Sequence, residues 1–190
     1  MSEESALLDK AQEVDRSVFD AVAGWSSPLL DKIMPALSIA ATYSRLWMAI
    51  AALFAVVGGT KGRKTAVEGM AAIGVTSFLA NVVLKGLTDR TRPTDPVPEE
   101  RALKKPDSTS FPSGHTASAA AFSGVVDRAY PSLWIPINGL AAAVGFSRVY
   151  TGVHYPGDVV GGWILGKAAA FGVDRVARHA GFAGLSTSHS

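Results

Sequence analysis

Six apolar stretches, each closed by charged or turn-forming residues, run in series along most of this 190-residue chain. They cover residues 27–43, 45–59, 64–87, 113–129, 131–148 and 154–178. Alanine and glycine recur in them, as in AAIGV and ASAAAFSG. Small residues let helices approach closely in a bilayer, where the hydrophobic effect no longer drives one helix against another. The pattern predicts an all-α fold, an integral-membrane bundle of six transmembrane helices.

The lengths of these stretches leave a second interpretation open. A helix over 113–129 rises only about 25 Å, whereas the hydrocarbon core of a bilayer is about 30 Å thick. Composition does not decide, because 48% hydrophobic and 18% charged residues lie between the values of soluble domains and of strongly hydrophobic transporters. A soluble all-α bundle with small core residues is the alternative.

The segment before the first stretch has a different pattern. Apolar residues recur at spacings of three and four over 5–23, as at Val14, Val18 and Val22, with charged residues between them. This spacing predicts an amphipathic helix, docked on its own protein or lying in the membrane interface. Its charges interrupt any apolar run, so no cleaved secretory signal is expected. We divide the chain into an N-terminal amphipathic segment (1–24), a membrane domain (25–180) and a flexible tail (181–190).

Basic residues gather in alternate loops. Lys61, Arg63 and Lys64 follow the second stretch, and Arg175 and Arg178 lie at the end of the sixth. The positive-inside rule favours the cytoplasm for both groups. With a cytoplasmic N-terminus, six spans then place the long, Pro-rich segment 88–112 on the extracytoplasmic face of the plasma membrane.

Composition also excludes several chemistries. The chain has no cysteine, so disulfides, zinc–thiolate sites, iron–sulfur clusters and cysteine nucleophiles are ruled out. A formal net charge of +2 is too small to indicate a nucleic acid partner. The sequence also lacks a cluster of carboxylates with the spacing of a metal site. We therefore expect neither a metal nor a cofactor.

Polar residues cluster at three ends of the apolar stretches, all on the same predicted side. The first cluster holds Lys85 and Arg92, although basic side chains at a helix end can also snorkel or favour the helix dipole. The second opens the fourth stretch with Ser113, Gly114 and His115. A serine N-cap followed by glycine leaves backbone N–H groups free at a positive helix end, which suits a phosphate. An ordinary N-cap has the same sequence.

The third cluster contains Arg148, His154 and Asp158. His154 and Asp158 are four residues apart at a helix start, so the carboxylate can hold one ring nitrogen and expose the other. Cationic donors and backbone amides suit a phosphoryl group, whose transition state spreads charge over its equatorial oxygens. One histidine as nucleophile and a second as acid are sufficient to hydrolyse a phosphate ester.

These clusters follow the pattern K-x6-R-P, then P-S-G-H, then S-R-x5-H-x3-D. The pattern resembles the three-part signature of the PAP2 (phosphatidic acid phosphatase type 2) superfamily, which includes membrane lipid phosphatases, soluble acid phosphatases and vanadium haloperoxidases. The matching positions are Lys85, Arg92, Pro93, Pro112, Ser113, Gly114, His115, Ser147, Arg148, His154 and Asp158. No position departs from the signature, and three parts in order are a strong signal.

The resemblance implies a role for each residue in a vanadate-sensitive bacterial lipid phosphatase. His154 attacks phosphorus and becomes a phosphohistidine, and Asp158 holds its tautomer. His115 protonates the leaving oxygen and then activates water. The residues that grip the phosphate are Lys85, Arg92, Ser113, Gly114 and Arg148. Arg90 is not a signature position, and we expect it behind the site or at the surface.

Other activities remain alternatives. A soluble acid phosphatase, a haloperoxidase-like relative or a lipid phosphotransferase would use the same residues, whereas a non-catalytic membrane scaffold would not need them. Small family members that resemble this chain act on undecaprenyl pyrophosphate, phosphatidylglycerophosphate or decaprenylphosphoryl-phosphoribose. The signature contacts only the phosphate, so the lipid itself, phosphatidate included, would be chosen by segment 88–112 and the helix faces. The sequence predicts no particular oligomeric state.

Overall fold

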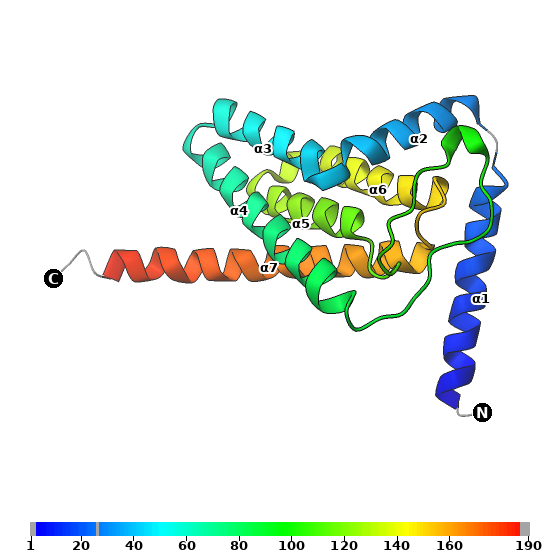
Figure 1. Ribbon diagram of the computed structural model, residues 1–190. Helices are drawn as coiled ribbons and strands as arrows, with labels where there is room; N and C mark the ends of the chain where they lie inside the picture. The colour runs from blue at the N-terminus through cyan, green and yellow to red at the C-terminus, as the bar shows by residue number, and fades with distance from the viewer. Residues whose placement is uncertain (1–2, 26, 187–190) are drawn as a thin grey trace.

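The computed structural model describes residues 3–25 and 27–186, and within these ranges the fold is all helical. The long helices are α1 (Glu3–Ala23), α2 (Pro28–Ala40), α3 (Arg45–Val57), α4 (Gly59–Phe78), α5 (Gly114–Ala129), α6 (Trp134–Tyr150) and α7 (Pro156–Ser186). The short ones are η1 (Thr42–Ser44), η2 (Leu79–Leu84, a π-helix that continues α4), η3 (Glu99–Arg101) and η4 (Pro131–Leu133). Helices α4 to α7 run side by side, and α1 stands across their ends (Figure 1).

Helix α5 is the centre of the bundle, and its side chains are buried from Thr116 to Val126. Two glycines one turn apart on α7 face it. A Cβ at Gly162 would lie 2.5 Å from the Ser113 carbonyl oxygen, and one at Gly166 would lie 2.3 Å from that of Ala117. The close helix packing that the alanine- and glycine-rich pattern predicts is therefore present between α5 and α7.

The bundle presents apolar side chains on its outside. Exposed large apolar residues include Leu53, Val56, Val67, Phe78, Ile135, Ile164 and Val176. Among the described residues, one helix, Gly59–Leu84, is long and apolar enough by itself to cross a membrane, with a mean hydropathy of 1.6. The pair Pro28–Ala40 and Thr42–Val57 meets the same criteria only when taken together. The predicted count of six separate spans is not confirmed.

Helices α2 and α3 are two halves of one bent unit. Each has 13 residues, a rise of about 20 Å that is short of a hydrocarbon core. Tyr43 and Ser44, between them, have φ angles of 53° and 59° in the left-handed region. The two segments meet at a bend of 64°, and α3 leads away from α2 rather than back along it (Figure 1). The stretches expected as two separate antiparallel spans thus continue one another across the bend.

Helix α1 covers the segment where an amphipathic helix is expected, but Val14 and Val18 of the expected apolar face are exposed, whereas Val22 is buried. Phe19 and Val22 pack with Tyr150 and Tyr155 in one buried cluster, and the helix lies beside the start of α7 and the loop after η2 (Figure 1). The turns that follow α3 and α5, with the far end of α7, lie at the other end of the bundle (Figure 1). The N-terminal helix therefore does not share the side of the basic turns, contrary to our expectation.

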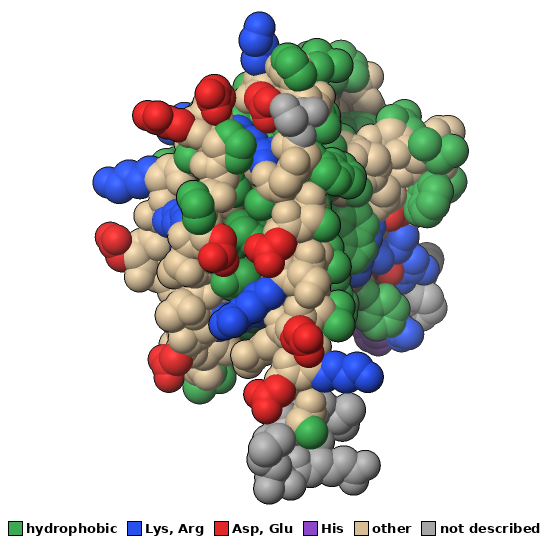
Figure 2. Space-filling model, turned by 90° about the vertical axis from the view of Figure 1, so that its right-hand side faces the viewer, with side chains coloured by type: hydrophobic (Ala, Val, Ile, Leu, Met, Phe, Trp, Pro, Cys, Tyr) green, Lys and Arg blue, Asp and Glu red, His purple; other side chains and the backbone are tan. Residues whose placement is uncertain are grey.

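The end of the bundle that carries α1 is polar. Acidic and basic side chains are scattered over it, while hydrophobic side chains gather toward one flank (Figure 2). At the other terminus, α7 continues to Ser186, so a helix extends into segment 181–190, where we expected a flexible tail. Residues 187–190 lie outside the described ranges.

Candidate active site

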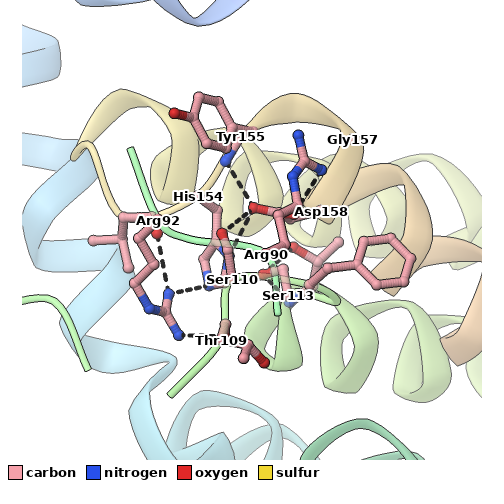
Figure 3. Close-up of polar contacts among 12 residues, drawn as sticks. Arg90, Arg92, Thr109, Ser110, Ser113, His154, Tyr155, Gly157 and Asp158 are labelled. Atoms are coloured by element: carbon pink, nitrogen blue, oxygen red, sulfur yellow. Dashed lines mark hydrogen bonds and ion pairs between the residues drawn. The ribbon is translucent and has the colours of Figure 1, made fainter. Parts of the chain in front are cut away.

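His154 lies at the centre of the predicted site, in the short connection between α6 and α7. The side chain is 3% exposed, and its backbone N–H donates to the Arg148 carbonyl at 3.1 Å. Nδ1 lies 3.3 Å from Asp158 Oδ2, and Nε2 lies 3.1 Å from the Arg92 guanidinium (Figure 3). The carboxylate thus holds one ring nitrogen, and the other faces a cation. This is the geometry that the four-residue spacing predicts.

Asp158 is a fully buried carboxylate in the first turn of α7. Besides His154, it accepts hydrogen bonds from the Tyr155 backbone N–H at 2.9 Å, from the Ser110 hydroxyl and from Arg90 Nη1 at 2.9 Å (Figure 3). A carboxylate with this many donors is held ionised and in one orientation.

Arg92 is fixed by the loop that precedes α5. Its Nε donates to the carbonyls of Pro106 at 3.1 Å and Ser108 at 3.0 Å. Nη2 donates to the Thr109 carbonyl at 3.1 Å, and Nη1 donates to the Val153 carbonyl at 3.0 Å. The loop therefore surrounds the guanidinium and directs Nη1 toward the His154 ring.

Lys85 follows η2 and points toward the same place. Its Nζ donates to Asn81 Oδ1 at 2.9 Å and to Ser108 Oγ at 3.3 Å. Burial lowers the pKa of Lys85, and the nearby charges of Arg92 and Arg148 lower this pKa further. Cations that repel one another in this way favour an anion between them.

Arg148 is the most enclosed cation of the site, with 5% of its surface exposed. Its Nη1 donates to the Ser38 hydroxyl, which comes from α2. Among the described residues, its buried Nε has no hydrogen-bond partner. A buried N–H without an acceptor is costly, and a phosphate oxygen would supply one.

Ser113 begins α5 as its N-cap. Its hydroxyl accepts from the Thr116 backbone N–H at 3.5 Å and from the Thr116 hydroxyl at 3.0 Å. Its own N–H donates to the Asp158 carbonyl at 3.0 Å. The backbone N–H of Ser113 is thus already hydrogen-bonded. The backbone N–H groups of Gly114 and His115 remain at the start of the helix to bind a phosphate.

His115 projects from the first turn of α5 toward the break between α2 and α3. Its Nε2 lies 3.4 Å from Thr42 Oγ1. Thr42 also donates to the Ser38 carbonyl at 3.2 Å. Because Ser38 contacts Arg148, the bent unit supplies one polar wall of the site.

The structure brings all eight predicted residues to one end of the bundle, and it adds others that sequence analysis missed. Ser38, Thr42 and Ser110 are isolated hydroxyl residues whose sequence positions carry no motif. Arg90 was expected behind the site or at the surface, and it lies behind Asp158. Among the side chains that the structure describes, no group of three His, Asp or Glu residues converges as metal ligands do.

Comparison with known proteins identifies the family of this chain. The family model described as the PAP2 superfamily matches residues 66–180. A decaprenylphosphoryl-5-phosphoribose phosphatase of Mycobacterium tuberculosis is 35% identical over 130 residues, covering 68% of this chain and 71% of that protein. The family match and the helical fold define a PAP2-type membrane protein. The chain belongs to the PAP2 superfamily.

Two further similarities show how far the likeness extends. An undecaprenyl-diphosphatase of Sulfolobus acidocaldarius is 37% identical over 109 residues, 52% of either chain. The chain therefore spans about half the length of this relative. The crystal structure of the transmembrane PAP2-type phosphatidylglycerolphosphate phosphatase of Bacillus subtilis superposes with a TM-score of 0.68 at 27% identity, covering 90% of this chain and 87% of that one.

Proposed function

We propose that the protein hydrolyses a phosphate or pyrophosphate ester of a membrane lipid through a phosphohistidine at His154. One observation carries the proposal: His154 is buried with Nδ1 on Asp158 and Nε2 facing Arg92. An imidazole held in this way presents a lone pair to an anion drawn in by the surrounding cations. The lipid phosphatase names of the relatives support the same class of reaction.

The reaction has two steps. Nε2 of His154 attacks phosphorus, the bond from phosphorus to the lipid oxygen breaks, and His115 gives that oxygen a proton. Water, deprotonated by His115, then attacks the phosphohistidine, releasing inorganic phosphate and neutral His154. Asp158 stabilises the imidazole whenever it carries positive charge.

The phosphate oxygens would lie among Lys85, Arg92, Arg148 and the first N–H groups of α5. The buried Nε of Arg148, which has no hydrogen-bond partner in the described part of the chain, supports this placement. These donors are already held by protein contacts, so they need little reorganisation when charge develops on the equatorial oxygens.

We propose that α2 with α3 crosses the membrane once as a broken helix, and that α4 to α7 cross it in turn. Helix α1 would lie in the interface on the side of the site. The basic turns would face the cytoplasm, so the site would open to the outer leaflet of the plasma membrane. Exposed apolar residues along the bundle support this arrangement.

The substrate class is a lipid with a terminal phosphate or pyrophosphate, either an isoprenoid or a glycerophospholipid. The test measures phosphate release by detergent-purified protein from undecaprenyl pyrophosphate, phosphatidylglycerophosphate, phosphatidate and decaprenylphosphoryl-phosphoribose. We expect turnover of at least one lipid, inhibition by vanadate, which mimics five-coordinate phosphorus, and no turnover by His154→Ala. Equal turnover by wild type and His154→Ala would overturn the proposal.

A further inference from the structure

Helix α1 reaches the active site through one buried carboxylate. Asp15 is 8% exposed, whereas its neighbour Val14 is 56% exposed and Arg16 is also exposed. A buried carboxylate is costly unless it is paired and hydrogen-bonded. Asp15 has both kinds of partner: Oδ1 accepts the Gly157 backbone N–H at 2.6 Å, and Oδ2 pairs with Arg90 Nη2.

Arg90 extends this contact to the catalytic pair. While Nη2 holds Asp15, Nη1 donates to Asp158 Oδ1 at 2.9 Å. Oδ2, the other oxygen of Asp158, faces His154. A single guanidinium therefore bridges the carboxylate of α1 and the carboxylate that orients the nucleophile.

Aromatic packing holds the guanidinium in place. Arg90 lies over the ring of Tyr155, 4.9 Å from its centroid. The Tyr155 ring in turn meets Phe19 of α1 edge-on, with centroids 5.5 Å apart. Docking of α1 thus sets the position of Arg90 from two directions.

Gly157 leaves little space around the contact between Asp15 and Arg90. A Cβ at Gly157 would lie 2.9 Å from Asp15 Oδ2 and 3.2 Å from Arg90 Nη1. Any larger residue would displace the carboxylate or the guanidinium. The start of α7 is therefore shaped to receive the side chain of Asp15.

We propose that Asp15 is a positioning residue for the catalytic histidine, acting through Arg90 on Asp158 and through the Gly157 N–H on the first turn of α7. This inference rests on the proposed function. Without Asp15, Arg90 keeps one carboxylate partner and can rotate away from Asp158, so His154 is less strictly oriented. Asp15 is 8% exposed and contacts Arg90 and Gly157 rather than the proposed phosphate donors, so we expect substrate binding to be unaffected.

The test compares Asp15→Asn with Asp20→Asn, an exposed carboxylate five residues further along α1. Gel filtration in detergent measures the amount of folded protein, and kcat and KM are determined per mole of folded protein. We expect Asp15→Asn to lower kcat about 10-fold, because misorientation of reacting groups costs up to about 100-fold, with KM within about 2-fold. Asp20→Asn should match wild type. Gly157→Ala, which displaces Asp15 without removing it, should reproduce the kcat loss.

A double variant checks the route. If Asp15 acts through Arg90, adding Asp15→Asn to Arg90→Gln should lower kcat little beyond Arg90→Gln alone. The proposal that Asp15 acts through Arg90 would be overturned by a wild-type kcat in Asp15→Asn. It would also be overturned if the loss of kcat in the double variant equalled the product of the two single losses. Wild-type protein that released no phosphate from any of the four lipids would instead overturn the proposed function.

Discussion

At the scale of single residues, the proposed mechanism requires a histidine that is neutral when it attacks phosphorus. Burial lowers the pKa of His154 from its ordinary value of 6.5, and its hydrogen bond with Asp158 opposes that shift only in part. The positive charges of Arg148 and Arg92 lower this pKa further. His154 is therefore unprotonated across the physiological range, with its lone pair available.

This shift predicts a pH profile. A base whose pKa is lowered by folding stays neutral as pH falls through 6.5, so the rate of phosphoenzyme formation should decline only at lower pH. Asp158→Asn removes a charge that raises the pKa, so it should move the acid limb lower still while reducing the rate. Rapid-quench measurements of the rate of phosphoenzyme formation over roughly pH 4 to 8, a range that includes the ordinary imidazole pKa, test this prediction. An acid limb centred above 6.5 would contradict it.

The lowered pKa of His154 also makes the free energy of unfolding depend on pH. The unfolded chain binds a proton at His154 at higher pH than the folded protein does, because the folded pKa is lowered. Stability should therefore be fully present above the ordinary pKa and should decrease as pH falls below it.

The two histidines should differ in their dependence on the leaving group. His154→Ala should abolish phosphoenzyme with every substrate. His115→Ala should retain some labelling when the leaving oxygen is weakly basic, as in p-nitrophenyl phosphate, because acid assistance then matters less. Rapid quench with labelled substrate measures both. Equal labelling of wild type and His154→Ala would refute these roles. So would a decrease in phosphoenzyme labelling of His115→Ala that is the same for strongly and weakly basic leaving groups.

At the scale of elements, the bent unit of α2, η1 and α3 supplies side chains that no sequence motif marks. The left-handed backbone at Tyr43 and Ser44 costs free energy, and such strain often accompanies function. Here the break brings Thr42 to His115.

Thr42→Val should test this contact, because valine keeps the shape and removes the hydroxyl. We expect kcat to fall about 5-fold, in the range of one lost hydrogen bond, and to fall more with poor leaving groups that depend on His115. The matched control is Thr60→Val, at an exposed position near the far end of the bundle. Identical kinetics for the two variants would show that Thr42 does not orient His115.

The contact between α5 and α7 gives a prediction of stability. Gly166→Ala places a methyl group 2.3 Å from the Ala117 carbonyl, and overpacking of this kind costs about 1–3 kcal/mol. Gly172→Ala on the same helix meets nothing within 4 Å and should be neutral or slightly stabilising. Thermal unfolding in detergent compares them. Equal midpoints for the two variants would contradict the close packing.

At the scale of the whole molecule, the arrangement in the membrane can be tested with single cysteines, because the native chain has none. Cysteines at the exposed positions Glu100 and Glu13 should both react with an impermeant maleimide in intact cells. A cysteine at the exposed Arg63 should react only after lysis. Labelling at position 100 but not at position 13 would indicate that the N-terminal helix lies on the other side, and so a sixth crossing. Labelling at position 63 in intact cells would indicate that the protein has the opposite orientation.

Much of this protein could be predicted from its sequence, because the controlling signals are local. Apolar stretches between charges predicted the all-helical fold, and the three-part signature predicted the family, which is confirmed. The His154–Asp158 geometry also follows from a spacing of four residues, since both partners belong to one short segment.

Contacts between distant segments were decided only by the tertiary structure. Asp15 meets Arg90 across 75 residues, and Ser38 meets Arg148 across 110. An isolated hydroxyl or carboxylate has no periodicity, so its partner depends on how helices pack. The same holds for α1, whose amphipathic pattern predicts a helix but not the end of the bundle on which it docks. Sequence periodicity reports one face of one element, whereas the site is assembled from the ends of several elements.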